Sequence, residues 1–149
     1  MILLEKEKKQ LEILLVEDNP ADVKLASVAL MGLSQPYHLN VVDNGAKAMD
    51  FLARQGDYAA VPRPDLIFLD WNLPLKNGKE VLVEIRKDPN LNRIPVVVLS
   101  ISGLETNVSD AYSLGAKFYV TKPMGLDRFA VVMGSVIKIL NNQQNLSPN

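Results

Sequence analysis

The stretch Pro64–Asp70, which reads PDLIFLD, decides the fold. Its apolar run is short, and a turn signal, WNLP, follows it at Trp71–Pro74. This pattern predicts a strand that is buried on both faces. Asp70 would then stand at the carboxyl end of the strand, which is the edge where α/β sheets bind ligands. A simpler interpretation makes Asp70 an ordinary turn residue, because Asp is common in turns.

The composition indicates one globular domain. The chain has 149 residues, a hydrophobic content of 48% and a formal net charge of −1. This charge balance gives no indication of a nucleic-acid partner. There is no cysteine, which excludes disulfides and thiolate metal sites and fits a reducing compartment. No apolar run approaches the ~20 residues that span a bilayer, and the first residues contain no signal-peptide core. We expect a cytoplasmic protein without a membrane anchor.

Strand and helix patterns alternate along the whole chain. The predicted strands are residues 11–16, 37–42, 64–70, 94–100 and 117–121. The predicted helices run from Pro20 to about Leu33, from about 45 to 53, from 79 to 87, from 104 to 114, and from Leu126 to about Asn141. Five such alternations predict an α/β fold with a doubly wound, five-stranded parallel sheet in the order 2-1-3-4-5.

The boundaries of the domain and of its first helix can be placed more closely. We assign residues 1–10 to an N-terminal extension, 11–141 to the domain and 142–149 to a loose polar tail. Asn19 is a predicted N-cap, and Pro20 suits the first helical position. The apolar residues expected to face the core from this helix are Ala21, Leu25, Val28 and Ala29.

Polar side chains follow four of the predicted strands. Glu17 and Asp18 follow the first, Asp70 the third, Ser100 the fourth and Lys122 the fifth. Parallel strands bring these positions to one edge of the sheet. Neighbouring carboxylates repel each other, and Mg²⁺, which prefers oxygen ligands, would relieve this repulsion. A carboxylate can also act as a nucleophile and form an aspartyl-phosphate. Lys122 and Mg²⁺ would neutralise the phosphoryl oxygens, and Ser100 would donate a hydrogen bond to one of them.

Several motifs at these strand ends occur together in one known family. The motifs are Val16–Asn19, Phe68–Asp70, Asn72–Pro74 with Gly78, Val98–Ser100 and Tyr119–Pro123. Over about residues 11–141 the chain resembles the receiver domain of two-component response regulators. The resemblance implies a flavodoxin-like, CheY-like three-layer fold. It also implies a signalling module that is not an enzyme, apart from catalysing its own phosphorylation and dephosphorylation.

The resemblance implies roles for individual residues. Asp70 would accept a phosphoryl group from a phosphohistidine of a sensor histidine kinase, in a reaction that needs Mg²⁺. Asp18 and Asp70 would bind Mg²⁺ directly, together with the backbone carbonyl of Asn72, while Glu17 would act partly through water. Lys122 would neutralise the phosphoryl group.

The resemblance also implies a switch. Ser100 and Tyr119 would form a pair that changes position on phosphorylation. Ile101 follows Ser100 where family members often carry a small residue, so we expect it to crowd the site or the inward movement of Tyr119.

Further features resemble a subgroup, the stand-alone regulators paired with cyanobacterial phytochrome kinases. They are the sequence LVEDNPAD at Leu15–Asp22, the long loop at Gly56–Pro64, and a chain that ends shortly after the last helix.

The last predicted helix carries more apolar residues than one face needs. One stripe comprises Leu126, Phe129, Ala130, Met133, Ile137 and Leu140. Val131, Val132 and Ile139 fall outside it, and we expect them to form a homodimer interface with Phe118. The output face would consist of the fourth helix, the fifth strand and the fifth helix. The alternative is that these apolar residues are scattered surface positions.

Three other functions are compatible with parts of the pattern. A pseudo-receiver would act as an interaction module without phosphorylation, although Asp18, Asp70 and Lys122 are all present. A Mg²⁺-dependent phosphatase with an aspartyl nucleophile would need a second acid where Asn72 stands. A flavin site would need a Ser/Thr-Gly phosphate loop where Glu17 and Asp18 would repel a phosphate. His38, the one histidine, is expected to be a surface or strand-edge residue rather than a metal ligand.

Overall fold

Five parallel strands form a single sheet in the order β2-β1-β3-β4-β5. The computed structural model describes residues 10–101, 103–122 and 125–146, so most of the expected N-terminal extension and Pro123 lie outside the described residues. The strands are β1 (Leu11–Val16), β2 (Tyr37–Val42), β3 (Leu66–Asp70), β4 (Val96–Ser100) and β5 (Phe118–Thr121). The predicted fold class and strand order are confirmed.

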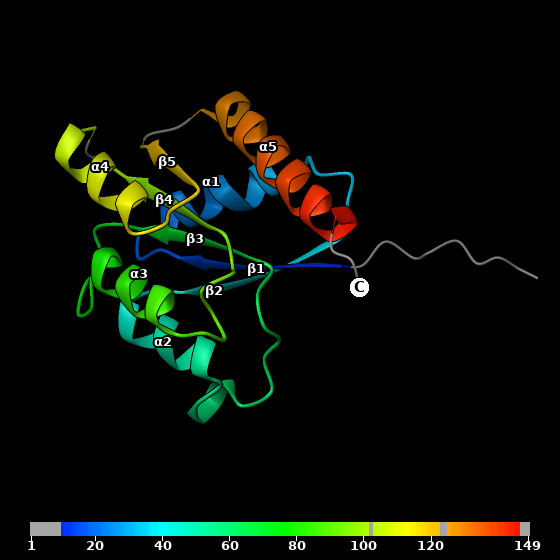
Figure 1. Cartoon of the computed structure of the whole chain (residues 1–149). Helices are drawn as coiled ribbons and strands as arrows, with labels where there is room; N and C mark the ends of the chain where they lie inside the picture. Colours follow the sequence, from blue (N-terminus) through cyan, green and yellow to red (C-terminus); the bar gives the residue numbers. More distant parts are fainter. Residues whose placement is uncertain (1–9, 102, 123–124, 147–149) are drawn as a thin grey trace, which may run out of the picture.

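Helices cover both faces of this sheet (Figure 1). The helices are α1 (Pro20–Leu30), α2 (Gly45–Ala53), the short 3₁₀ helix η1 (Gly56–Tyr58), α3 (Gly78–Lys87), α4 (Glu105–Ser113) and α5 (Leu126–Leu146). Helices α1 and α5 lie on one face, and α2, α3 and α4 lie on the other. Each face of the sheet therefore has its own hydrophobic core.

Strand β3 lies in the middle of the sheet, and all five of its residues are buried. Leu66 and Phe68 belong to the core beneath α1 and α5, whereas Ile67 and Leu69 belong to the core beneath α2 and α3. A strand with two buried faces needs apolar residues at successive positions, which explains the uninterrupted run that the sequence shows.

Helix α1 begins as predicted, but its most deeply buried residues are not the predicted ones. The Asn19 side chain accepts hydrogen bonds from the backbone N–H groups of Ala21 and Asp22, and Pro20 is the first helical residue. The expected core stripe was wrong in part: Ala29 packs against the core, but Ala21 and Val28 are exposed, and the fully buried residues are Ala26 and Leu30. Their spacing of four is one helical turn, and the other apolar residues of α1 are at least partly exposed.

Helix α5 continues to Leu146, so the prediction of a loose tail from residue 142 was wrong for its first five residues. No Gly or Pro occurs between Leu140 and Pro148, and polar residues such as Gln continue a helix readily. The buried row comprises Phe129, Met133, Val136 and Leu140. Two members of the expected stripe, Leu126 and Ala130, are exposed.

Gly78 allows the start of α3 to touch the end of β3. A Cβ atom at this position would lie 2.4 Å from the carbonyl oxygen of Asp70 and 2.7 Å from the Cα of Trp71. The N–H of Gly78 donates to the carbonyl of Trp71 at 3.2 Å, which closes the loop between the two elements. Only glycine fits so close to this backbone.

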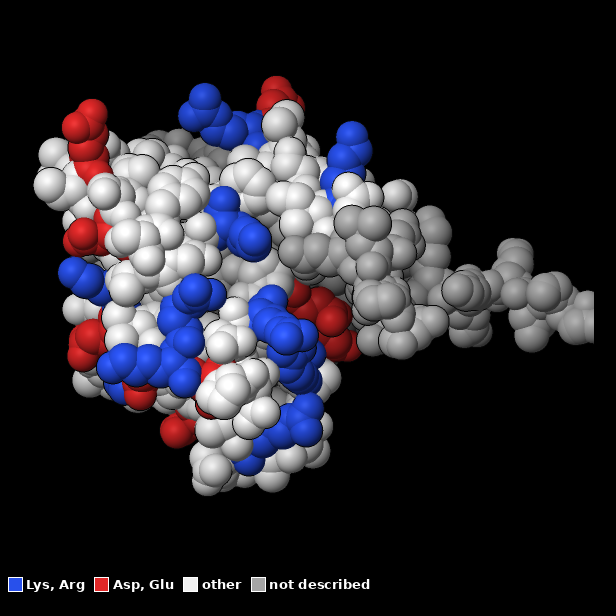
Figure 2. Space-filling view, viewed as in Figure 1, with Lys and Arg blue, Asp and Glu red and all other residues white. Residues whose placement is uncertain are grey.

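The surface carries its charges unevenly. Lys and Arg side chains gather over α3 and the loop that leads into β4, with a small group of acidic side chains at the right border of this region (Figure 2). Among the described helices, none is both long and apolar enough to cross a membrane.

We predict that Gly78→Ala lowers the free energy of unfolding by about 2 kcal/mol or more, because the added methyl group has to displace the backbone of Asp70 and Trp71. The matched control is Gly134→Ala in α5, where an added Cβ meets nothing within 4 Å. That change should stabilise the helix by about 0.5–1 kcal/mol. Urea unfolding followed by circular dichroism measures both, and equal effects of the two substitutions would contradict this explanation.

Candidate functional site

Asp70 ends the central strand and is only 3% exposed. The backbone that follows it is held to β4, since the N–H of Trp71 donates to the carbonyl of Leu99 at 2.8 Å. Its carboxylate accepts a hydrogen bond from the backbone N–H of Asn72 at 3.0 Å, through Oδ1. The other oxygen, Oδ2, lies 3.4 Å from Nζ of Lys122. The simpler interpretation of Asp70 as a turn residue therefore does not hold.

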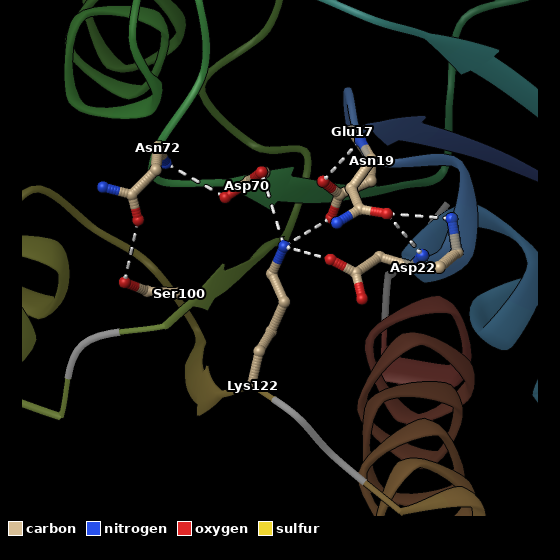
Figure 3. Close-up of polar contacts among 8 residues, drawn as sticks. Glu17, Asn19, Asp22, Asp70, Asn72, Ser100 and Lys122 are labelled. Atoms are coloured by element: carbon tan, nitrogen blue, oxygen red, sulfur yellow. Dashed lines mark hydrogen bonds and ion pairs between the residues drawn. The ribbon is translucent and has the colours of Figure 1, made fainter.

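Lys122 joins three carboxylates from different parts of the chain (Figure 3). Its Nζ lies 2.7 Å from Oε1 of Glu17, 2.9 Å from Oδ2 of Asp22 and 3.4 Å from Oδ2 of Asp70. Its backbone N–H donates to the carbonyl of Ser100, which continues the pairing of β5 with β4. The Lys122 side chain is 11% exposed, so these ion pairs are poorly screened by solvent.

The buried position of Glu17 changes its protonation. Burial, and to a lesser extent the neighbouring Asp70, raise the pKa of the Glu17 carboxyl from 4.5 to about 7, although Lys122 opposes both. For Lys122, burial alone would lower the pKa. Hydrogen bonds with Glu17 and Asp22 and the charge of Asp70 outweigh burial and hold the pKa of Lys122 well above its usual range.

The predicted acidic residues converge on one point. One carboxylate oxygen from each of Glu17, Asp18 and Asp70 lies within 4.8 Å of the other two. Asp18 is exposed, while the other two are buried, so the cluster has one side open to solvent. Three carboxylates without a nitrogen or sulfur donor suit a hard divalent cation such as Mg²⁺.

Asn72 lies beside this cluster. Its backbone N–H donates to Asp70, and its side-chain Oδ1 accepts a hydrogen bond of 3.4 Å from Oγ of Ser100. Asp18 and Asn72 both line an open depression of about 560 Å³ that extends to α3 and α4. The expected bond from the Asn72 carbonyl to the cation stays a prediction.

Ser100 and Tyr119 occupy different environments. Ser100 is fully buried at the end of β4. Tyr119 is half-buried against the core of α2 and α3, and its backbone N–H donates to the hydroxyl of Tyr112 in α4 at 3.0 Å. Ile101 is 71% exposed, so it is not packed into the site in this structure. The switching role of the pair stays a prediction.

Asp22 is the site residue that sequence reasoning missed. It lies in the first turn of α1, four residues after Asp18, and its carboxylate contacts Lys122. An acid in the first turn of a helix is usually explained by its interaction with the helix dipole. The sequence therefore offers no reason to expect a contact with Lys122. His38 is half-exposed at the edge of the sheet, with Nδ1 3.0 Å from Oε1 of Glu12, as expected of a strand-edge residue.

The predicted dimer residues lie on β5 and α5. Val131 is 69% exposed, whereas Phe118, Val132 and Ile139 are half-buried. Other large apolar residues are exposed on or beside α4 and α5, namely Ile101, Leu104, Tyr112 and Leu126. This face has the apolar surface that an interface needs, and the homodimer itself stays a prediction.

We predict that the metal-free protein loses stability as the pH rises from 5 to 8, by on the order of 2 kcal/mol through Glu17. The pKa of Glu17 is higher in the folded chain than its ordinary value of 4.5, so the folded state binds more protons in this range. Lys122, whose pKa is raised, keeps its charge throughout. Urea unfolding in EDTA should therefore show a smaller pH dependence for Glu17→Gln than for the wild type. The same substitution at exposed Glu105 is the control, and equal pH dependence in Glu17→Gln and the wild type would refute the prediction.

Comparison with known proteins agrees with this geometry. Residues 13–133 match the family described as the response regulator receiver domain. Response regulator Rcp1 of Synechocystis sp. is 47% identical over 123 residues, which are 82% of this chain and 84% of that protein.

Solved structures show the same relationship. The phosphorylated cyanobacterial phytochrome response regulator RcpA is 41% identical, with a TM-score of 0.80 over 91% of this chain and 96% of the other. The Mn²⁺-bound form of Rcp1 is 47% identical, with a TM-score of 0.76 over 83% and 89%. The resemblance to cyanobacterial phytochrome regulators is thus confirmed, and this chain belongs to the response regulator receiver domain family.

Proposed function

We propose that this protein is a phosphorylation switch of a two-component system, with Asp70 as the phosphoryl acceptor. One observation carries the proposal. The buried carboxylate of Asp70, at the end of the central strand, lies beside two further acids that could hold a cation with it, and beside the ammonium group of Lys122. This places a nucleophile beside groups that can neutralise a phosphoryl group.

The reaction is a transfer from a phosphohistidine of a sensor histidine kinase. An oxygen of the Asp70 carboxylate attacks phosphorus and forms a new O–P bond, while the N–P bond breaks. The electron pair of the broken bond stays on the imidazole nitrogen, which then takes a proton from solvent. The other carboxylate oxygen keeps the hydrogen bond from Asn72, which fixes the direction of attack.

The neighbouring residues stabilise the added charge. Lys122 contacts Asp70 already and would form an ion pair with a phosphoryl oxygen. Ser100, now bonded to Asn72, is placed to donate to another oxygen when that bond is exchanged. Glu17, Asp18 and Asp70 would hold Mg²⁺, which supplies charge neutralisation at the phosphoryl oxygens when it is bound. The existence of a Mn²⁺-bound form of Rcp1 supports the binding of a divalent cation by this chain.

The likeness to RcpA and Rcp1 supports a narrower proposal, that the phosphoryl donor is the kinase of a phytochrome. The output would be a protein contact or homodimer through α4, β5 and α5, where exposed apolar residues gather. The hydrogen bond from Tyr119 to Tyr112 connects two of these elements directly. We place this function in the cytoplasm and assign no catalysis beyond the protein's own phosphorylation and dephosphorylation.

Incubation with acetyl phosphate tests the acceptor. We predict a single phosphoryl adduct by intact mass, formed with Mg²⁺ and lost in EDTA, because the acidic cluster needs a cation before it admits a phosphoryl group. Asp70→Asn should form no adduct. The control Asp43→Asn changes an exposed acid, 60% accessible, and should be phosphorylated like the wild type.

Failure has a distinct meaning in this experiment. Phosphorylation of Asp70→Asn at the wild-type level would refute the acceptor assignment. Absence of any adduct from both acetyl phosphate and a purified phytochrome kinase would identify a pseudo-receiver instead. Sedimentation of the phosphorylated sample tests the output face, and Val131→Glu should weaken any dimer that forms.

A further inference from the structure

A second polar depression lies at the opposite edge of the sheet from Asp70. Its volume is about 600 Å³, which falls in the range of small-molecule sites. Its walls come from the end of α3 and from the segments that lead into β4 and β5. The lining residues are Arg86, Asn92, Arg93, Ile94, Pro95, Gly115, Ala116 and Lys117.

The three cations of this depression have no acidic partner among the residues that the structure describes. Elsewhere in the described chain, four lysines form ion pairs with acids, namely Lys47, Lys76, Lys79 and Lys122. No such pair involves Arg86, Arg93 or Lys117. Lysine and arginine gather over this part of the surface (Figure 2). Because the whole chain has a net charge of −1, this positive region is a local feature.

Arg86 is held in the wall by its contacts. An added Cβ at Gly115 would lie 2.5 Å from Nε of Arg86, so the arginine side chain lies directly against this glycine. Gly115 has a φ of +100°, which favours glycine and turns the chain from α4 towards β5. Nη1 of Arg86 also reaches the carbonyl oxygen of Asn92 at 3.4 Å. A guanidinium has five N–H donors, so it can bind an anion while it keeps this contact.

The dipole of α3 explains only part of this arrangement. Arg86 and Lys87 lie in the last turn of α3, where positive side chains favour the partial negative charge of the helix end. Arg93 and Lys117 lie on other segments, and the same reason does not apply to them. Two acids lie two residues from Arg86 along the chain: Glu84 pairs with Lys76, and Asp88 accepts a hydrogen bond from the N–H of Asn90 at 2.8 Å.

We propose that Arg86, Arg93 and Lys117 form a binding site for a diphosphate group, as in inorganic pyrophosphate or a nucleoside diphosphate. Arginine pairs well with phosphate oxygens, and several separate cations suit a ligand with more than one charged group. The acidic cluster around Asp70 carries charge of the opposite sign and would repel such a ligand in the absence of a cation. The site is independent of the proposed phosphorylation, because its residues lie before β4 and β5, whereas Ser100 and Lys122 lie at the opposite ends of these strands.

Titration of the ¹⁵N-labelled protein with sodium pyrophosphate, in EDTA and at low ionic strength, tests the site. We expect saturable shifts of the amide signals of Ile94, Gly115 and Ala116, which line the depression. Arg93→Gln combined with Lys117→Gln should weaken binding about tenfold, since charged hydrogen bonds are lost. Parallel titrations with adenosine diphosphate and with adenosine distinguish two kinds of site. A nucleotide site binds adenosine diphosphate more tightly than pyrophosphate, whereas a site for the inorganic anion does not.

The matched control removes two charges elsewhere. Lys24→Gln combined with Lys138→Gln alters exposed lysines of α1 and α5 and should change the affinity by less than about twofold. Equal weakening in both double variants would show general charge attraction and overturn the proposal. Shifts centred on Asp18 and Asp70, or no saturable shift at all, would also overturn it.

Discussion

The site depends on the ion pairs between the ammonium group of Lys122 and three carboxylates. This ammonium group lies within 3.4 Å of carboxylate oxygens from β3, from the end of β1 and from the first turn of α1. Without this cation, the buried Glu17 and Asp70 would face each other as like charges in a poorly solvated place. The sheet brings these groups together because β1, β3, β4 and β5 are neighbours in parallel pairing and their carboxyl ends lie at the same edge. The parallel sheet therefore gathers the charged side chains of the site at one edge.

Close backbone contacts position the residues around this edge. Gly78 lets α3 start against the backbone of Asp70, and Asn19 caps α1 directly after the acidic pair Glu17 and Asp18. Asp18 alone stays exposed, which leaves a path for a cation or a phosphoryl donor. The relationship to RcpA and Rcp1 fits this arrangement, since the solved structures of these relatives are a phosphorylated and a Mn²⁺-bound form.

Sequence patterns predicted the strands well because each buried strand is a short apolar run between turn residues. They also predicted the convergence of Glu17, Asp18, Asp70, Ser100 and Lys122. Parallel strands place their carboxyl ends at one edge of the sheet, so residues at or just after these ends lie close together. They failed where tertiary contacts decide. The core residues of α1 and the end of α5 depend on packing and on the absence of a helix breaker, and Asp22 could be explained without Lys122. The basic depression joins residues 86–95 with residues 115–117, which lie much further along the chain, so no local pattern indicates it.

The binding of Mg²⁺ to Lys122→Met tests the central interaction most directly. Trp71 follows Asp70 and is 8% exposed, so its fluorescence can report the cation. If the ammonium group and the metal are stabilised by the same carboxylates, the loss of Lys122 should tighten Mg²⁺ binding, by about threefold or more. Lys138→Met, which alters an exposed lysine of α5, should leave the affinity unchanged. An affinity of Lys122→Met that is equal to or weaker than that of the wild type would contradict the shared role of these carboxylates.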